Sequence, residues 1–267
     1  MFEEYLFPIL LFAGIGFGSA ILLTIFSNLF SIKTDSRIAD IDEKLPQANC
    51  GACGYAGCED YAKAIIEQEA ETNLCKVGGE KTAAVIAQIM GKPAPAFHHE
   101  IAVVHCHGTC DKAPRKFKFD GIQTCTSAKR YFGGTNACIY GCIGLGDCQN
   151  VCQYDAIRII DGIANIQPGM CRACGACAAV CPNHLISLRP TAKHFDIRCS
   201  SQDTPKNTKT ACEVGCLSCR LCEKKCENDA IHIENQHAVI DYSKCTNCGI
   251  CATVCPTHAI CNCEVTD

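Results

Sequence analysis

The chain contains no tryptophan, 3 methionines and 7% aromatic residues, so a large conventional aromatic core is not expected for its 267 residues. It also lacks an excess of positive charge. The formal net charge is −4 at pH 7, which argues against a strongly basic nucleic-acid-binding protein. Hydrophobic residues nevertheless make up 48% of the chain, which excludes an intrinsically disordered protein.

Several catalytic signatures are also missing. The sequence has no phosphate-binding loop, no flavin motif and no residues arranged for acid–base or nucleophilic catalysis, so hydride chemistry is not expected. Cysteine, by contrast, is abundant, with 27 residues. Disulfides within the chain cannot use an odd number of cysteines, and the spacing of these residues favours metal ligation.

Two stretches of the chain share one dense cysteine pattern. Residues 171–182 and 245–256 both read C-x2-C-x2-C-x3-C-P. This is the ligand run of bacterial ferredoxins, in which three cysteines hold one [4Fe–4S] cluster and the fourth ligates the neighbouring cluster. The alternatives are a zinc site, which pairs C-x2-C with further cysteine or histidine ligands, or a set of disulfides. The duplicated spacing argues against both.

The pattern belongs to a longer internal repeat, in which adding 74 to a residue number of the first copy gives its counterpart in the second. The first copy contains Cys125, Cys138, Cys142, Cys148, Cys152, Cys171, Cys174, Cys177 and Cys181. The second contains Cys199, Cys212, Cys216, Cys219, Cys222, Cys226, Cys245, Cys248, Cys251 and Cys255. The repeat predicts two tandem ferredoxin-like modules of the α+β class. Each combines two short ligand-bearing helices with short strands such as 157–160 and 164–166.

The repeat predicts three complete ligand sets. They are Cys216, Cys219 and Cys222 with Cys255; Cys245, Cys248 and Cys251 with Cys226; and Cys171, Cys174 and Cys177 with Cys152. The fourth set has only Cys142, Cys148 and Cys181, because Leu145 stands where the second copy has Cys219. Either a [3Fe–4S] centre forms there or Cys138 supplies a fourth ligand. We favour Cys138, since a three-iron centre typically has a higher potential and would trap electrons.

A separate cysteine group precedes the repeat. Cys50, Cys53 and Cys58 lie in a glycine-rich loop, and Cys75 follows after an amphipathic helix predicted over 61–70. Four cysteines in a compact loop–helix unit suffice for one further [4Fe–4S] cluster. A second helix is predicted over 81–90, and the following Gly-Lys-Pro-Ala-Pro sequence indicates a linker.

Two additional groups can be assembled from the remaining cysteines. The first is Cys106, Cys110, Cys125 and Cys138, and the second is Cys199, Cys212, Cys261 and Cys263. The complete sets predict at least four clusters, and the prediction for the whole chain is six. The alternative for the second group is that its members are free thiols.

The N-terminal region indicates a membrane anchor. No charged residue lies between Glu4 and Lys33, and the apolar run over 5–32 is long enough to span a hydrocarbon core of about 30 Å. A signal peptide would have a basic start and a shorter apolar core. Lys33, Arg37 and Lys44 follow the run, so the positive-inside rule predicts a single-pass protein whose clusters face the cytoplasm.

These features divide the chain into five parts. They are an anchor (1–32), a four-cysteine domain (33–92), a connecting segment with a possible extra cluster (93–141), ferredoxin-like module 1 (142–198) and ferredoxin-like module 2 (199–267).

The order of these parts resembles one family, the B subunits of the Rnf electron-transport complex. The resemblance rests on the apolar anchor, the CGACGYAGC motif at 50–58, the segment 138–148 and the paired ferredoxin runs. It covers essentially the whole chain and matches the long, cluster-rich form found in anaerobes.

The resemblance implies a function. In that family the complex couples electron transfer between reduced ferredoxin and NAD to ion movement across the inner (cytoplasmic) membrane. The B subunit exchanges electrons with soluble ferredoxin and contacts other Rnf-type membrane subunits, and no nucleic-acid partner is expected. The alternatives are an independent membrane-tethered polyferredoxin that serves another reductase, and a zinc-ribbon scaffold.

Overall fold

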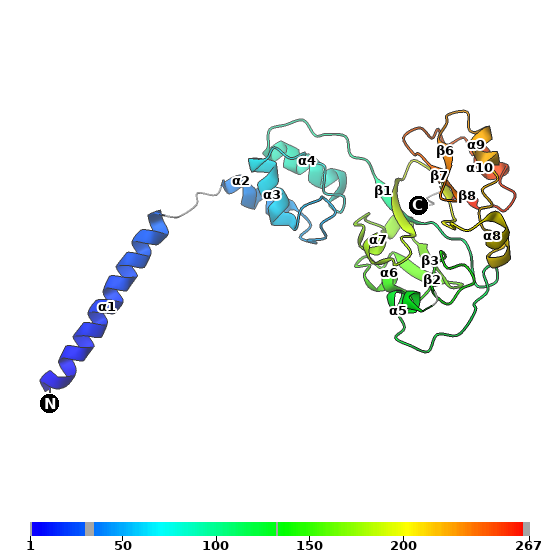
Figure 1. Cartoon of the computed structure of the whole chain (residues 1–267). Coiled ribbons are helices and arrows are strands. Elements are labelled where there is room, and N and C mark those ends of the chain that lie inside the picture. Colours follow the sequence, from blue (N-terminus) through cyan, green and yellow to red (C-terminus); the bar gives the residue numbers. More distant parts are fainter. Residues whose placement is uncertain (1, 30–34, 132, 264–267) are drawn as a thin grey trace.

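The computed structural model describes residues 2–29, 35–131 and 133–263. Within these residues it contains ten α-helices, one 3₁₀-helix and eight short strands, which confirms the α+β class. Figure 1 shows a long first helix, then a small helical domain, then two modules that mix short helices with short strands.

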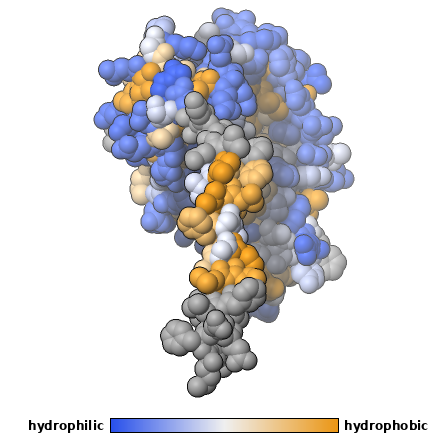
Figure 2. All heavy atoms as spheres, turned by 90° about the vertical axis from the view of Figure 1, so that its left-hand side faces the viewer, coloured by the Kyte–Doolittle hydropathy of each residue, from blue (hydrophilic) through white to orange (hydrophobic). Residues whose placement is uncertain are grey.

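The first helix, α1 (Phe2–Leu29), has the length and composition of a membrane span over Leu10–Ser27, and none of that window is buried. Phe12 and Phe17 are 72% and 71% exposed. Figure 2 shows most of the coloured part of this helix as hydrophobic surface, whereas the visible face of the folded domains is largely hydrophilic. Residues 30–32 of the predicted anchor, and Lys33, lie outside the described residues.

The four-cysteine domain is built from three helices, α2 (Ser36–Lys44), α3 (Cys58–Glu67) and α4 (Gly79–Ile89). Both predicted helices are confirmed, each starting a few residues earlier than expected. Tyr61 is buried in the domain core. Its hydroxyl donates to the carbonyl oxygen of Glu71 (2.7 Å) and accepts from the backbone N–H of Leu74 (3.2 Å). These two bonds hold the loop that presents Cys75.

The two modules repeat the same hairpin and helix arrangement. Module 1 contains α6 (Asp147–Asn150), β2 (Ile157–Ile160), β3 (Ile163–Ile166), η1 (Pro168–Met170) and α7 (Ala176–Val180). Module 2 contains α8 (Pro205–Ala211), α9 (Leu221–Lys225), β6 (Ile231–Glu234), β7 (His237–Ile240) and α10 (Ile250–Thr253). Ile157 pairs with Ile166 in one hairpin, and Ile231 pairs with Ile240 in the other. The strand register therefore preserves the offset of the sequence repeat.

Each module also has a second two-stranded sheet that the sequence did not predict. In module 1, β1 (Glu100–Val104) pairs with β4 (Ile186–Pro190); in module 2, β5 (Phe195–Ile197) pairs with β8 (Ile260–Asn262). The strand β1 therefore belongs to module 1 rather than to a connecting segment over 93–141. The strand β5 likewise precedes the expected boundary at 199. The short helix α5 (Cys125–Arg130) lies between β1 and α6.

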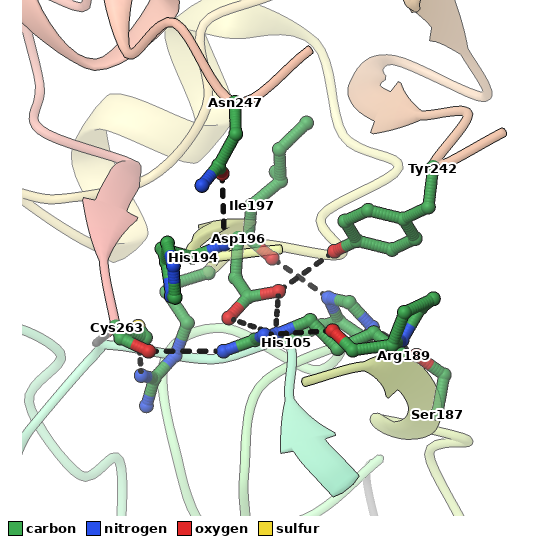
Figure 3. A network of polar contacts seen from close by, with 11 residues as sticks. His105, Ser187, Arg189, His194, Asp196, Ile197, Tyr242, Asn247 and Cys263 are labelled. Atoms are coloured by element: carbon green, nitrogen blue, oxygen red, sulfur yellow. Dashed lines mark hydrogen bonds and ion pairs between the residues drawn. The ribbon is translucent and has the colours of Figure 1, made fainter. Parts of the chain in front are cut away.

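A buried polar network joins the two modules (Figure 3). Arg189 of β4 and Asp196 of β5 are 1% and 0% exposed, and Arg189 Nε lies 2.8 Å from Asp196 Oδ1. The Tyr242 hydroxyl donates to the same carboxylate (2.7 Å), and Arg189 Nη2 donates to the carbonyl oxygen of Cys263 (3.0 Å). These contacts fix the end of module 1 against both sheets of module 2.

Candidate iron–sulfur centres

The loops that carry the predicted ligand runs share a backbone signature. In each, the second and fourth residues after the first cysteine have positive φ: Gly144 and Gly146, Ala173 and Gly175, Ser218 and Arg220, Asn247 and Gly249. A side chain held in this left-handed region costs of order 1–3 kcal/mol, and such strain concentrates at functional sites. Left-handed residues in a turn direct successive backbone N–H groups to one side, which favours a negatively charged group there.

Two of the predicted sets line cavities of their own. Cys152, Cys171, Cys174 and Cys177 surround one, with an empty volume of about 340 Å³. Cys216, Cys219, Cys222 and Cys255 surround another, of about 380 Å³.

The structure also brings together the other two sets predicted with four cysteines. Burial raises the pKa of the Cys251 thiol to about 11, and the nearby Cys245 and Cys248 thiols add to the rise. Cys226 packs in the same hydrophobic cluster. In the N-terminal domain, burial raises the pKa of the Cys75 thiol, with further contributions from the Cys58, Cys53 and Cys50 thiols.

Backbone N–H groups point at many of these sulfur atoms. Leu185 donates to Cys181 Sγ (3.4 Å), Ala230 to Cys226 Sγ (3.3 Å) and Gly78 to Cys75 Sγ (3.3 Å). Such hydrogen bonds stabilise thiolate sulfur and help to set the potential of an iron–sulfur cluster.

The incomplete set of module 1 gains a cysteine from an unexpected place. Cys125, Cys142, Cys148 and Cys181 line one cavity with an empty volume of about 370 Å³. Burial raises the pKa of the Cys148 thiol to about 11, and the Cys125 and Cys181 thiols add to the rise. The structure therefore differs from the sequence-based preference for Cys138 as the fourth ligand. Cys125 joins Cys142, Cys148 and Cys181, whereas Cys138 lines a different cavity.

Asp147, which the sequence analysis did not single out, holds Cys125 in place. Its buried carboxylate accepts from the backbone N–H groups of Cys125 (2.8 Å) and Thr126 (3.1 Å) at the start of α5. Asp147 is also the first residue of α6, and Cys148 follows it. One side chain thus ties the helix carrying Cys125 to the helix carrying Cys148.

The two additional groups assembled from the sequence do not form as expected. Cys106 and Cys138 line a cavity with Cys199 and Cys212. Cys110 is exposed, and its backbone N–H donates to the Asp161 carbonyl oxygen (2.9 Å) in the β2–β3 turn. Cys261 and Cys263 lie beside Arg198 instead, which donates to Cys263 Sγ (3.5 Å). The physical reason is that β1 and β5 carry Cys106 and Cys199 to one junction between the modules.

The geometry also bears on the choice between a cluster and a zinc ion. Four thiolates around a zinc ion must all lie about 2.3 Å from it. Among the residues that the structure describes, no three Cys, His, Asp or Glu side chains converge closely enough to hold a single ion. Hollows that are each lined by four cysteines from a ferredoxin run and a distant segment instead suit a cube of four irons and four sulfides. Fold and cavities together define an iron–sulfur protein of the polyferredoxin type.

Comparison with known families agrees with that class. A family model for an Fe–S cluster domain matches residues 45–77, and a model for a 4Fe–4S binding domain matches residues 164–187 and 238–261. The two latter matches are related by the same offset as the cysteines of the repeat.

Relatives cover nearly the whole chain. The B subunit of the ion-translocating oxidoreductase complex of Methanosarcina acetivorans is 38% identical over 249 residues, which is 93% of this chain and 94% of the relative. The B subunit of the Na⁺-translocating ferredoxin:NAD⁺ oxidoreductase complex of Acetobacterium woodii is 37% identical over 97% of this chain and 78% of its own length. The proton-translocating counterpart from Clostridium ljungdahlii is 36% identical over 92% and 88%. The chain belongs to this family of Rnf-type B subunits.

Proposed function

We propose that the chain is the iron–sulfur electron-transfer subunit of a membrane complex that couples electron exchange between ferredoxin and NAD to ion translocation. The names of the relatives support this function. The chain itself offers one-electron chemistry, since its distinctive residues are cluster ligands and bound clusters would carry the electrons.

The observation that carries the proposal is that the cysteine sets lie next to one another in two groups, one of three sets from the N-terminal domain into module 1 and one of two sets in module 2. Burial is the main cause that raises the pKa of the Cys174 thiol, and the Cys50 thiol of the N-terminal domain adds to the rise. Burial raises the pKa of Cys177 to about 12, with Cys148 of the next set contributing. In module 2, the Cys222 thiol likewise adds to the raised pKa of the Cys251 thiol. Sets whose thiols are close enough to change each other's pKa are neighbours, and clusters bound in neighbouring sets would form a path for electrons.

The proposed ligands follow these sets. Five [4Fe–4S] clusters are held by Cys50, Cys53, Cys58 and Cys75; Cys152, Cys171, Cys174 and Cys177; Cys125, Cys142, Cys148 and Cys181; Cys216, Cys219, Cys222 and Cys255; and Cys226, Cys245, Cys248 and Cys251. The four-cysteine cavity with Cys125 favours a [4Fe–4S] cluster there over a [3Fe–4S] centre.

Reduction by ferredoxin tests the proposal. The full chain, reconstituted anaerobically in detergent, is expected to lose visible absorbance when reduced ferredoxin is added, because electrons enter its clusters. Oxidised ferredoxin is the control. An unchanged spectrum with reduced ferredoxin, while dithionite bleaches the same sample, would favour the alternative of a tethered polyferredoxin that serves another reductase. Co-purification with the other subunits of an Rnf-type complex provides a second measurement.

The proposed location is the inner membrane, with the clusters on the cytoplasmic side. The span Leu10–Ser27 and the basic residues Arg37 and Lys44 support this orientation. Protease added outside right-side-out vesicles is therefore expected to leave the modules intact, whereas lysed vesicles should show their digestion. Cleavage of the modules in sealed vesicles would contradict the orientation. A variant lacking residues 1–34 is expected to stay soluble without detergent.

A further inference from the structure

A cavity between the two modules is lined by four cysteines from four separate segments. Cys106 follows β1, Cys138 precedes α6, Cys199 follows β5 and Cys212 directly follows α8. The empty volume is about 420 Å³, similar to the 340–380 Å³ of the three ferredoxin-type cavities. Neither family match covers these four residues.

The two modules contribute to this cavity in the same way. The residue before each strand-end cysteine makes the same bond: His105 N–H donates to Leu185 O and Arg198 N–H donates to Ala259 O, both at 2.7 Å. The two acceptors occupy equivalent positions of the sequence repeat. Cys106 and Cys199 are therefore structural equivalents, although the offset of the repeat does not relate them.

The sulfur atoms of these two cysteines are also held alike. The backbone N–H of Cys142 donates to Cys106 Sγ (3.3 Å), and that of Cys216 donates to Cys199 Sγ (3.2 Å). Cys142 and Cys216 line the adjacent ferredoxin-type cavities. One hydrogen bond therefore links each half of the cavity to the next cysteine set in its own module.

The other two thiols come from a short motif that both modules carry. Residues 138–142 read C-I-Y-G-C, and residues 212–216 read C-E-V-G-C. In each, the first cysteine lines the cavity between the modules and the last lines the ferredoxin-type cavity of its own module. At Gly108, a Cβ atom would lie 3.1 Å from Cys212 Sγ. Any other residue at this position would therefore require the sulfur atom or the backbone to move by a few tenths of an ångström.

A positive charge borders the cavity. Arg198 lines it, and its Nη2 donates to the Cys106 carbonyl oxygen (3.3 Å). Arg198 Nε is buried and has no hydrogen-bond partner among the described residues. A [4Fe–4S] cluster with four thiolates carries a net charge of about −2, which this guanidinium would offset.

We infer that Cys106, Cys138, Cys199 and Cys212 hold a sixth [4Fe–4S] cluster that connects the two ferredoxin-like modules. This site deepens the proposed electron-transfer function and rests on it. It stands between the sets that contain Cys142 and Cys216, so electrons can cross from one module to the other. Each crossing oxidises the donor site and reduces the acceptor site by one electron, without breaking a bond at the cysteines.

Iron and sulfide analysis of the anaerobically reconstituted full chain tests the inference. The wild type is expected to bind about 24 irons, and the double variant Cys138→Ala/Cys212→Ala about 20, because one four-iron cluster is lost. The matched control Cys110→Ala/Cys261→Ala also removes one thiol from each module, both outside the cavities, and should keep the wild-type iron content. The irons that remain in the first variant report that the other sites still fold.

Several outcomes would overturn the site. They are an unchanged iron content in Cys138→Ala/Cys212→Ala, an equal loss in the control, one cluster fewer than expected in the wild type, or one zinc per chain. The single variant Cys199→Ala should still lose at least about one iron, and a full complement would contradict the inference. None of these measurements uses ferredoxin, so a failure of the proposed partner would leave them interpretable.

Discussion

Replacement of Cys125 by alanine is expected to turn one four-iron cluster into a three-iron cluster. The variant leaves Cys142, Cys148 and Cys181 in a cavity that otherwise has four cysteines, and three cysteines are the ligand pattern of a [3Fe–4S] centre. The oxidised protein should therefore lose about one iron per chain and gain the EPR signal of an oxidised three-iron cluster. The oxidised wild type should lack this signal.

Two companion variants sharpen the experiment. Cys110→Ala removes an exposed thiol and should leave both iron content and EPR spectrum unchanged. Adding Leu145→Cys to Cys125→Ala is expected to suppress the signal, because position 145 corresponds to Cys219, which lines the equivalent cavity of module 2. A three-iron signal already present in the wild type, or no change in Cys125→Ala, would show that Cys125 is not a ligand.

The second large effect is expected at the buried ion pair between the modules. Asp196→Ala leaves the Arg189 guanidinium buried without its carboxylate, and it also removes the acceptor of the Tyr242 hydroxyl. Removing one partner of a buried pair typically costs about 3–5 kcal/mol. The midpoint of urea-induced loss of cluster absorbance, measured anaerobically, should fall accordingly.

An exposed pair provides the control for this measurement. Asp120 pairs with Lys118 at 3.5 Å, and their side chains are 81% and 89% exposed; pairs of this kind contribute at most about 1 kcal/mol. Asp120→Ala makes the same change of charge and should leave the midpoint almost unaltered. The combined variant Arg189→Met/Asp196→Leu is expected to recover part of the loss. Equal midpoints for Asp196→Ala and Asp120→Ala would contradict the role assigned to the network.

The sequence predicted those ligand sets whose spacing is local. Three cysteines of a ferredoxin run lie close together in the chain, and the repeat supplies the distant fourth, so Cys152 and Cys226 could be assigned without a structure. The hairpins over 157–166 and 231–240 were predictable for the same reason, since their alternating apolar residues recur at the same offset.

The remaining assignments depended on contacts between distant segments. The repeat aligns Cys125 with Cys199, but the hydrogen bonds to Leu185 and Ala259 show that Cys106 is the structural counterpart of Cys199. The connection after β1 is longer than its counterpart after β5, and Cys125 lies in that extra length.

The elements that make this connection were hidden from sequence reasoning. The strands β1 and β5 are five and three residues long, and the 74-residue offset does not relate them to each other, so the repeat gave no signal for either. The C-x2-G-C motif at 138 and 212, whose copies the 74-residue offset also relates, was the sequence signal that linked Cys138 with Cys212.

The cavity between the modules has a consequence for the ancestry of the chain. Equivalent patches of the two modules line this cavity. Each patch consists of the cysteine that follows a strand, Cys106 or Cys199, and the first cysteine of a C-x2-G-C motif, Cys138 or Cys212. Contact between identical patches is isologous, the form found in two-fold symmetric homodimers. A single-module ancestor that paired with a second copy of itself would have assembled the same four thiols, two from each polypeptide. Gene duplication and fusion would then have placed a former subunit interface inside one protein.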